Sequence, residues 1–290
     1  MVTKPWPFEI RPLPDVTFGA VVTGFRIADL DDEGFASLYG TWLERALLIF
    51  PDQHLNREQQ VRFAGRFGPL EFDYAPISNV DKAGVVHAEA SDGVVKMLKG
   101  NMGWHCDSTY MPVQAKGAVF SAEIVPPSGG ETGWADMRAA YDALSDEMKA
   151  KIEPLKAFHS LHYSQAKLGQ HAGAKDGYTS YGFSVKNPPL RPLVKIHPET
   201  GRKTLAIGRH AYGIPGLTEA ESDRLLEQLS EEACQPPRMY THRWTSGDVV
   251  VWDNRRLMHR AYPWEMTQPR VMYHSRIAGD SVTEFAAAAA

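Results

Sequence analysis

Apolar residues recur at steps of three and four positions near the start of the chain, which predicts helices there. We expect two helices between residues 31 and 67, the second beginning after Asn56, a suitable N-cap. Between them, the compact apolar run 46–50 stops at Pro51 and favours a buried strand over a helix end. The apolar positions of the first helical stretch are Phe35, Leu38, Trp42, Ala46 and Ile49.

From residue 95 onward the pattern changes to short apolar or alternating runs that are separated by glycine and proline, which predicts strands. Two helical inserts interrupt them, at 136–155 and at 218–234, the second opening with Thr218 and Glu221 in capping-box spacing. The chain is therefore predicted to be mainly β with flanking helices. The predicted strands are 117–125, 191–196, 204–208, 249–253 and 270–277.

Composition and length are consistent with one self-sufficient domain. The 290 residues are 43% hydrophobic, which is enough to bury a full core. We expect a single domain over residues 1–285 and set aside the alanine run 286–290, a low-complexity tail of the kind that cloning leaves behind.

Charge, hydropathy and cysteine content argue against several classes of protein. The formal net charge is -4 and no basic stripe with interleaved aromatics is present, which argues against a nucleic-acid partner. No apolar run has membrane-spanning length, and the N-terminus lacks the layout of a signal peptide, so we expect a cytoplasmic protein. Cys106 and Cys234 lie far apart outside any CxxC spacing, which supports neither a disulfide framework nor a thiolate zinc site.

A candidate metal site begins with His105 and Asp107, two residues apart, which point to the same face if the segment is extended. A third ligand is available at His259, shortly after the predicted strand 249–253. Two histidines and one carboxylate form the facial arrangement that suits Fe(II) oxygenases, because it leaves three positions open. A bare His-x-Asp pair is common by chance and a histidine among apolar neighbours is often part of a core, so a structural reading stays open.

Arg270 strengthens the functional reading. It lies eleven residues after His259, and alternation puts it on one strand face with Met272, His274 and Arg276. Polar residues on the interior face of a strand are costly unless they bind something. A guanidinium meets a carboxylate with two parallel hydrogen bonds, as a bound dicarboxylic keto acid would require.

These motifs resemble the Fe(II)- and 2-oxoglutarate-dependent taurine dioxygenase superfamily over nearly the whole chain. The matching segments are 66–69, the block Trp104-His-Cys-Asp-Ser-Thr109, 129–133, 205–215, 253–254 and 258–261, followed by Arg270. Within the superfamily the sequence is most similar to the aryloxyalkanoate dioxygenases, on the stretches 100–112, 118–123 and 269–276.

The resemblance implies a double-stranded β-helix, or jelly roll, with helices packed outside one sheet. It implies Fe(II) on His105, Asp107 and His259, with 2-oxoglutarate and O2 as co-substrates and ascorbate as an activator in assays. Thr132 and Arg270 match the residues that hold 2-oxoglutarate, and Asn101 matches a pocket asparagine. A turn threonine, a turn asparagine and a surface arginine are the structural alternatives.

The substrate contacts are less well specified by the resemblance. The taurine enzyme has a second arginine four residues after the co-substrate arginine, whereas this chain has His274, which argues against taurine. A replacement cation is available in Arg276, or in Arg209 with His210. The structural alternatives are a surface salt bridge for Arg209 and a pair with Asp280 for Arg276.

The implied reaction hydroxylates an aryloxyalkanoate next to the ether oxygen and releases a phenol and a keto acid, together with succinate and CO2. Other readings keep the cofactors with an alkyl sulfate, a sulfonate or another small carboxylate as substrate, or replace catalysis by metal binding in a jelly-roll protein. A zinc hydrolase would leave Arg270 unexplained. Homo-oligomers are usual in the family, though no segment here proves one.

Side chains that would suit an aryl group are Met102, Trp104, Tyr110, Met111 and Phe183.

Overall fold

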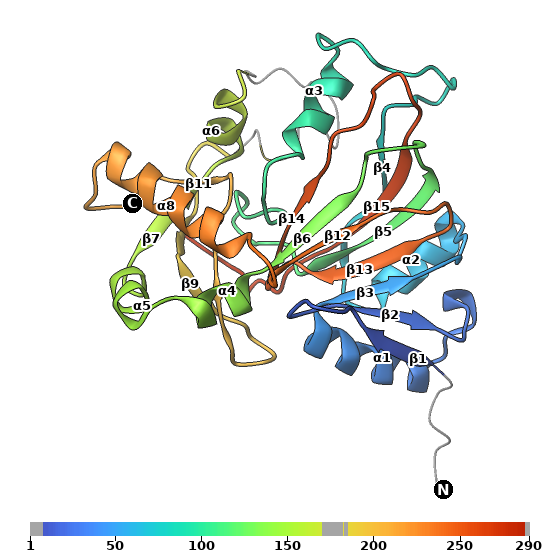
Figure 1. The fold of residues 1–290 in the computed structure, drawn as a ribbon, viewed down its shortest axis with the longest axis horizontal. Helices are drawn as coiled ribbons and strands as arrows, with labels where there is room; N and C mark the ends of the chain where they lie inside the picture. Colours follow the sequence, from blue (N-terminus) through green and yellow to red (C-terminus); the bar gives the residue numbers. More distant parts are fainter. Residues whose placement is uncertain (1–7, 170–181, 183–184, 288–290) are drawn as a thin grey trace, which may run out of the picture.

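A computed structural model describes residues 8–169, 182 and 185–287. Its largest element is a seven-stranded sheet, the major sheet, in the order β1-β2-β3-β13-β5-β15-β4 (Figure 1). All neighbouring strands in this sheet are antiparallel except β2 and β3. The strands are β1 Glu9–Pro12, β2 Ala20–Thr23, β3 Leu47–Phe50, β13 Val249–Asp253, β5 Gly117–Ile124, β15 Val271–Ile277 and β4 Leu70–Ser78.

Smaller sheets complete the described β structure. The minor sheet has the order β12-β6-β14, a second three-stranded sheet has the order β11-β7-β8, and β9 pairs with β10. The predicted strand 191–196 is split into two because β8 ends at Pro192, which has no backbone N–H to donate. The strands are β12 Met239–His242, β6 Thr132–Asp136, β14 Leu257–Ala261, β11 Ala211–Tyr212, β7 Lys156–His159, β8 Leu190–Pro192, β9 Val194–Ile196 and β10 Lys203–Leu205.

The helices begin where side chains cap them. Asn56 and Gln59 form a capping box at the start of α2, as Thr218 and Glu221 do for α8. The predicted helix 136–155 is two helices, because Ser145 caps a new one. The helices are η1 Ile27–Asp29, α1 Asp32–Arg45, α2 Arg57–Gly65, α3 Gly93–Gly100, α4 Met137–Ala143, α5 Asp146–Ile152, α6 Leu161–Ala166 and α8 Glu219–Ala233.

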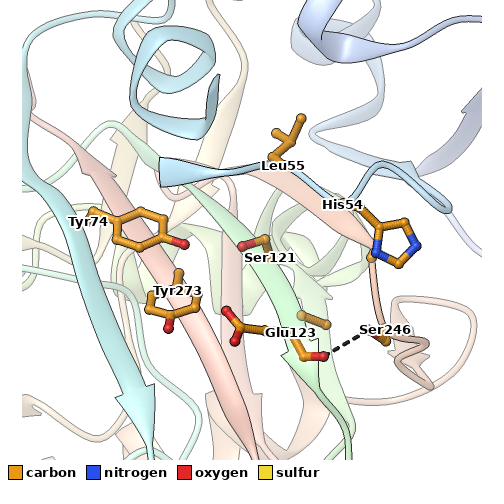
Figure 2. Close-up of a pocket in the computed structure, with 9 residues that line it drawn as sticks. His54, Leu55, Tyr74, Ser121, Glu123, Ser246 and Tyr273 are labelled. Atoms are coloured by element: carbon orange, nitrogen blue, oxygen red, sulfur yellow. Dashed lines mark hydrogen bonds between the residues drawn. The ribbon is translucent and has the colours of Figure 1, made fainter. Parts of the chain in front are cut away.

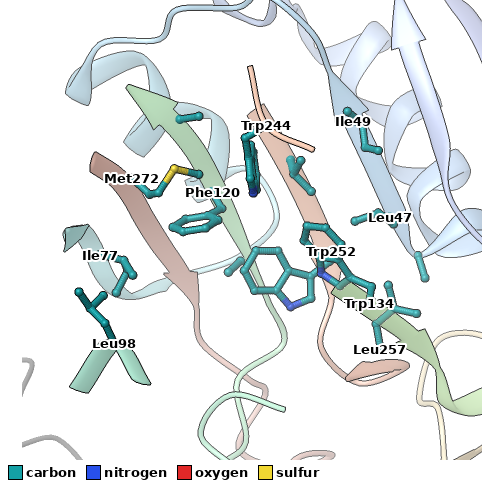
Figure 3. Close-up of a cluster of buried hydrophobic side chains, with 14 of the residues drawn as sticks. Leu47, Ile49, Ile77, Leu98, Phe120, Trp134, Trp244, Trp252, Leu257 and Met272 are labelled. Carbon is teal, nitrogen blue, oxygen red and sulfur yellow. The ribbon is translucent and has the colours of Figure 1, made fainter. Parts of the chain in front are cut away.

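The central strands of the major sheet, such as β3 and β13, are buried on both faces. Helices α1 and α2 cover its outer face, where Trp42 and Phe63 pack with Val119 and Val251. On the inner face, Trp252 of β13 lies 5.9 Å from the ring of Trp134 in the minor sheet (Figure 3). Burial on both faces explains why β13 is a continuous apolar run rather than an alternating one.

None of the helices in the described part of the chain is long and apolar enough to cross a membrane.

Candidate active site

Two segments far apart in the sequence bring the predicted metal ligands together. The backbones of His105 and His259 exchange two hydrogen bonds, with N···O distances of 3.0 and 2.7 Å. One donor atom from each of His105, Asp107 and His259 lies within 4.8 Å of the others. His105 and Asp107 are buried, and the His259 side chain is 12% exposed. The predicted triad is therefore assembled in space, although His105 lies at an isolated bridge rather than on a long strand.

The donor atoms are oriented for a metal ion. The carbonyl oxygen of Gly103 can only accept, so the 2.7 Å contact with Nδ1 of His105 fixes the proton there and leaves Nε2 as a ligand. Oδ2 of Asp107 is buried without a hydrogen bond and lies 3.8 Å from Nε2 of His259. A buried carboxylate oxygen left without hydrogen bonds beside two imidazoles is what an ion would satisfy.

Electrostatics keep the three candidate ligands in the protonation states that a metal needs. Burial lowers the pKa of His259 to about 4 and holds the pKa of His105 well below its usual value, so both rings are neutral at pH 7. Burial alone would raise the pKa of Asp107, but the charge of Arg276 and the neighbouring His259, His274 and His105 together outweigh it, and the pKa falls below its usual range. A neutral His pair and an ionised Asp fit Fe(II).

Arg270 is buried directly before β15, and its guanidinium makes one hydrogen bond within the described chain. Nε donates to the carbonyl of Gly130 over 3.1 Å, and the guanidinium lies 5.0 Å from the centre of the Trp264 ring. The two terminal nitrogens have no hydrogen-bond or ion-pair partner in the described chain. Burial lowers the pKa of Arg270 to about 10, so it stays charged at pH 7. Gly130 has φ +72°, and a Cβ there would lie 3.1 Å from the arginine side chain, so this turn requires glycine.

Thr132 lies two residues beyond that turn, on β6. It pairs with Ala261 of β14, which places its side chain on the same face of the minor sheet as His259. Its hydroxyl oxygen accepts a 2.9 Å hydrogen bond from the indole of Trp244, so the hydroxyl proton remains available to an acceptor. Asn101, at the end of α3, is close to the same strand, because its carbonyl accepts from the backbone N–H of Ala261.

Arg209 and His210 lie beside His105. The backbone N–H of Arg209 donates to the carbonyl of Trp104, and its terminal nitrogen lies 3.4 Å from the hydroxyl of Ser164. That same hydroxyl lies 2.8 Å from Nδ1 of His210, whose ring centre is 5.8 Å from that of His105. Arg209 forms no salt bridge in the described chain, so the alternative of a surface salt bridge receives no support.

His274 and Arg276 are directed at Asp107. Nε2 of His274 lies 3.5 Å from Oδ2 of Asp107, and its ring stacks on Trp252. Arg276 donates to Oδ1 of Asp107 over 2.9 Å. Its carboxylate partners are therefore Asp107 and Glu71, whereas the structural alternative predicted Asp280. The role of both residues in binding substrate stays a prediction.

Comparison with known proteins identifies the family. The family model described as "Taurine catabolism dioxygenase TauD, TfdA family" matches residues 9–276. The chain belongs to this dioxygenase family. It is 65% identical to an (S)-phenoxypropionate/alpha-ketoglutarate-dioxygenase of Sphingobium herbicidovorans over 97% of this chain and 98% of that protein. A protein of the same description from Delftia acidovorans is 57% identical, over 93% of this chain and 95% of the relative.

A solved structure agrees with this assignment. The crystal structure of AAD-2 in complex with Mn(II) and N-oxalylglycine superimposes with a TM-score of 0.87 at 38% identity, over 94% of this chain and 98% of that one. As a TauD, TfdA dioxygenase the protein is an oxidoreductase that uses Fe(II), 2-oxoglutarate and O2.

Sequence reasoning missed several partners in this TauD, TfdA site. The side chain of Asn254 accepts a 2.8 Å hydrogen bond from the backbone N–H of Asp107 and donates one to the carbonyl of Asp107. The Asp253-Asn254 motif could have suggested this role. Ser164 joins Arg209 to His210, and no local sequence signal marks it. Among the aromatic candidates, Tyr110 packs 4.8 Å from His210. Phe183 lies outside the described residues.

A surface hollow on the major sheet is separate from this site. It is lined by His54, Tyr74, Glu123, Ser246 and Tyr273, among others (Figure 2). Tyr273 neighbours the inward-facing His274 on β15, so alternation directs it to the opposite face of the sheet. The hollow therefore has no access to the metal ligands through the sheet.

Proposed function

We propose that the protein is an aryloxyalkanoate dioxygenase that hydroxylates a phenoxypropionate or phenoxyacetate next to its ether oxygen. The observation that carries the proposal is the combination of a three-donor metal cluster with a buried arginine whose terminal nitrogens the chain leaves unused. A metal-binding protein without turnover would have no use for that arginine. The relatives named for (S)-phenoxypropionate support the substrate class, since they match nearly the whole chain.

In this proposal His105, Asp107 and His259 hold Fe(II). The ion with 2-oxoglutarate and O2 supplies the oxidation of a C–H bond, giving succinate and CO2. Arg270 binds the distal carboxylate of 2-oxoglutarate with its two terminal nitrogens, and Thr132 donates its hydroxyl proton to the same co-substrate. We further propose that the major and minor sheets, which meet through Trp134 and Trp252, form the double-stranded β-helix of the family.

Arg209 is our candidate for the substrate carboxylate. It is a largely desolvated cation beside His105, and burial lowers its pKa to about 10, so it remains charged at pH 7. A charged donor without a carboxylate partner is suited to an anionic ligand. Tyr110 and Trp104 next to it provide aromatic surface for the aryl group. Hydroxylation beside the ether oxygen gives a hemiketal or hemiacetal, which breaks down to a phenol and a keto acid.

The test is a substrate panel with Fe(II), ascorbate and 2-oxoglutarate, in which O2 uptake and succinate are followed. Both enantiomers of dichlorprop, 2,4-D, taurine and an alkyl sulfate are compared. We expect strong stimulation by the aryloxyalkanoates alone. Stimulation by only the sulfur compounds would overturn the substrate class, and so would the absence of succinate with every compound.

A further inference from the structure

We propose that Arg276 is a positioning residue that restricts Asp107 to metal binding through one oxygen, Oδ2. It thereby keeps open a coordination position that the co-substrates need. The inference rests on the proposed function, because it takes His105, Asp107 and His259 as the metal ligands.

The two oxygens of Asp107 have different surroundings. Oδ1 accepts a 2.9 Å hydrogen bond from Nη2 of Arg276, a charge-assisted contact in a buried setting. Oδ2 makes no hydrogen bond and lies 3.8 Å from Nε2 of His259 and 3.5 Å from Nε2 of His274. For Oδ1 to become a second metal ligand, it would have to give up the guanidinium. Oδ2 is thus available to a metal ion, whereas Oδ1 is hydrogen-bonded to Arg276.

Arg276 is itself held from three sides. Nη1 donates to the hydroxyl of Ser108 over 3.3 Å, and that hydroxyl donates to the carboxylate of Glu71 over 3.0 Å. Nε lies 3.9 Å from the same Glu71 carboxylate, and the guanidinium packs 5.3 Å from the ring centre of Phe72. Both Glu71 and Phe72 belong to β4, which pairs with β15. Arg276 therefore has little freedom to follow Asp107 if the carboxylate rotates.

Coordination chemistry gives this restraint a function. A facial triad leaves three open positions on an octahedral ion. A keto acid that chelates through two oxygens takes two of them, and O2 needs the third. A carboxylate bound through both oxygens would take one of these positions, and 2-oxoglutarate would have to compete for it. Loss of the restraint should therefore weaken the binding of 2-oxoglutarate more than the binding of the metal.

The experiment measures binding by calorimetry without turnover, first of Mn(II) and then of 2-oxoglutarate to the Mn(II)-loaded protein. For Arg276→Met we expect Mn(II) affinity equal to or tighter than wild type and 2-oxoglutarate affinity lowered by about tenfold or more. Arg276→Lys keeps the charge but not the planar guanidinium, so we expect it also to weaken the binding of 2-oxoglutarate. Unchanged 2-oxoglutarate affinity in the lysine variant would overturn the positioning role in favour of charge alone.

Two further variants guard the interpretation. Arg256→Met removes another buried arginine, which bonds Asp136 and contacts none of the metal ligands, and we expect it to leave both affinities unchanged. If Arg276→Met is poorly folded, Ser108→Ala provides a second test, because it removes the hydroxyl that links Glu71 to Arg276. We expect this variant also to bind 2-oxoglutarate more weakly than wild type, by a smaller factor than Arg276→Met. Wild-type 2-oxoglutarate affinity in both variants would overturn the inference, as would loss of Mn(II) binding in a folded Arg276→Met.

Asp107→Ala separates this inference from the proposed function. We expect it to lower the affinity for Mn(II) by about 100-fold or more, since it removes a proposed ligand. If it bound Mn(II) like wild type, the proposed metal site would fail, whatever Arg276→Met does. If it lost Mn(II) while Arg276→Met bound 2-oxoglutarate normally, only the role of Arg276 would fail.

Discussion

The indole N–H of Trp244 donates a 2.9 Å hydrogen bond to the hydroxyl oxygen of Thr132. Both residues are buried, and because the hydroxyl accepts in this bond its proton remains available to another acceptor. The bond fixes the position of the Thr132 hydroxyl at the start of β6. Variants of the two residues can therefore distinguish the structural role of Thr132 from its proposed role in binding.

Thr132→Val should raise the KM for 2-oxoglutarate by about tenfold, because it removes one hydrogen bond to a charged ligand. Trp244→Phe removes the indole donor but leaves the hydroxyl, so its KM should rise much less, although its thermal stability should fall. Steady-state titration of 2-oxoglutarate in both variants measures the difference. Equal KM increases would show that the hydroxyl acts only through Trp244.

Arg270→Met should raise the KM for 2-oxoglutarate by about 100-fold or more, because two charge-assisted hydrogen bonds are lost. The variant should unfold at the same temperature as wild type or a higher one, since Nε is the one guanidinium nitrogen of Arg270 that has a hydrogen-bond partner in the described chain. Thermal unfolding of the metal-free protein checks the second expectation. A large loss of stability with normal 2-oxoglutarate binding would assign Arg270 to the fold.

Arg209→Gln should raise the KM for the aryloxyalkanoate by about 10- to 100-fold and leave the KM for 2-oxoglutarate near wild type, since the proposed contact is to the substrate carboxylate alone. Exposed Arg202, which pairs with Asp142, provides a matched control as Arg202→Gln. Equal increases in both KM values would contradict the assignment and place Arg209 at the co-substrate.

His159 predicts an acid dependence of stability. It is fully buried, neither ring nitrogen has a hydrogen-bond partner in the described chain, and burial lowers its pKa to about 3. Between this value and the ordinary pKa near 6.5 the unfolded chain binds a proton that the folded chain does not. The free energy of unfolding therefore falls as the pH is lowered through this window.

His159→Leu should flatten that dependence by about 1.4 kcal/mol per pH unit and leave stability at pH 7 nearly unchanged. Urea unfolding of the chelator-treated protein from pH 7 to pH 4 gives the slope. His162→Gln, an exposed neighbour, is the control and should follow wild type. Parallel curves for wild type and His159→Leu would contradict the expectation.

Local patterns predicted much of the fold. Asn56 and Thr218 begin helices because their side chains satisfy N–H groups three residues away, which is a local property. The break at Ser145 was missed because apolar spacing continues across it. Arg191 lies on a strand, β8, as predicted, but the spacing could not predict that its guanidinium donates to the carbonyls of Thr109 and Met111.

The same limit applies to the site. The structure brings His105, Asp107 and His259 together, as the resemblance predicted, while their role as metal ligands stays a prediction. The partner of Arg276 could not be predicted, since Asp107 is distant in the sequence and nearby Asp280 was equally available as a carboxylate. Ser164 was missed for the same reason, because only the packing of α6 brings it to His210.

The most direct test of the proposed function is the ratio of phenol to succinate during turnover of (S)-dichlorprop with Fe(II) and 2-oxoglutarate. We predict equimolar phenol and succinate, because each oxidation of 2-oxoglutarate is coupled to one hydroxylation beside the ether oxygen. Succinate formed at the same rate with and without the herbicide, and no phenol, would contradict the proposal that this site oxidises aryloxyalkanoates.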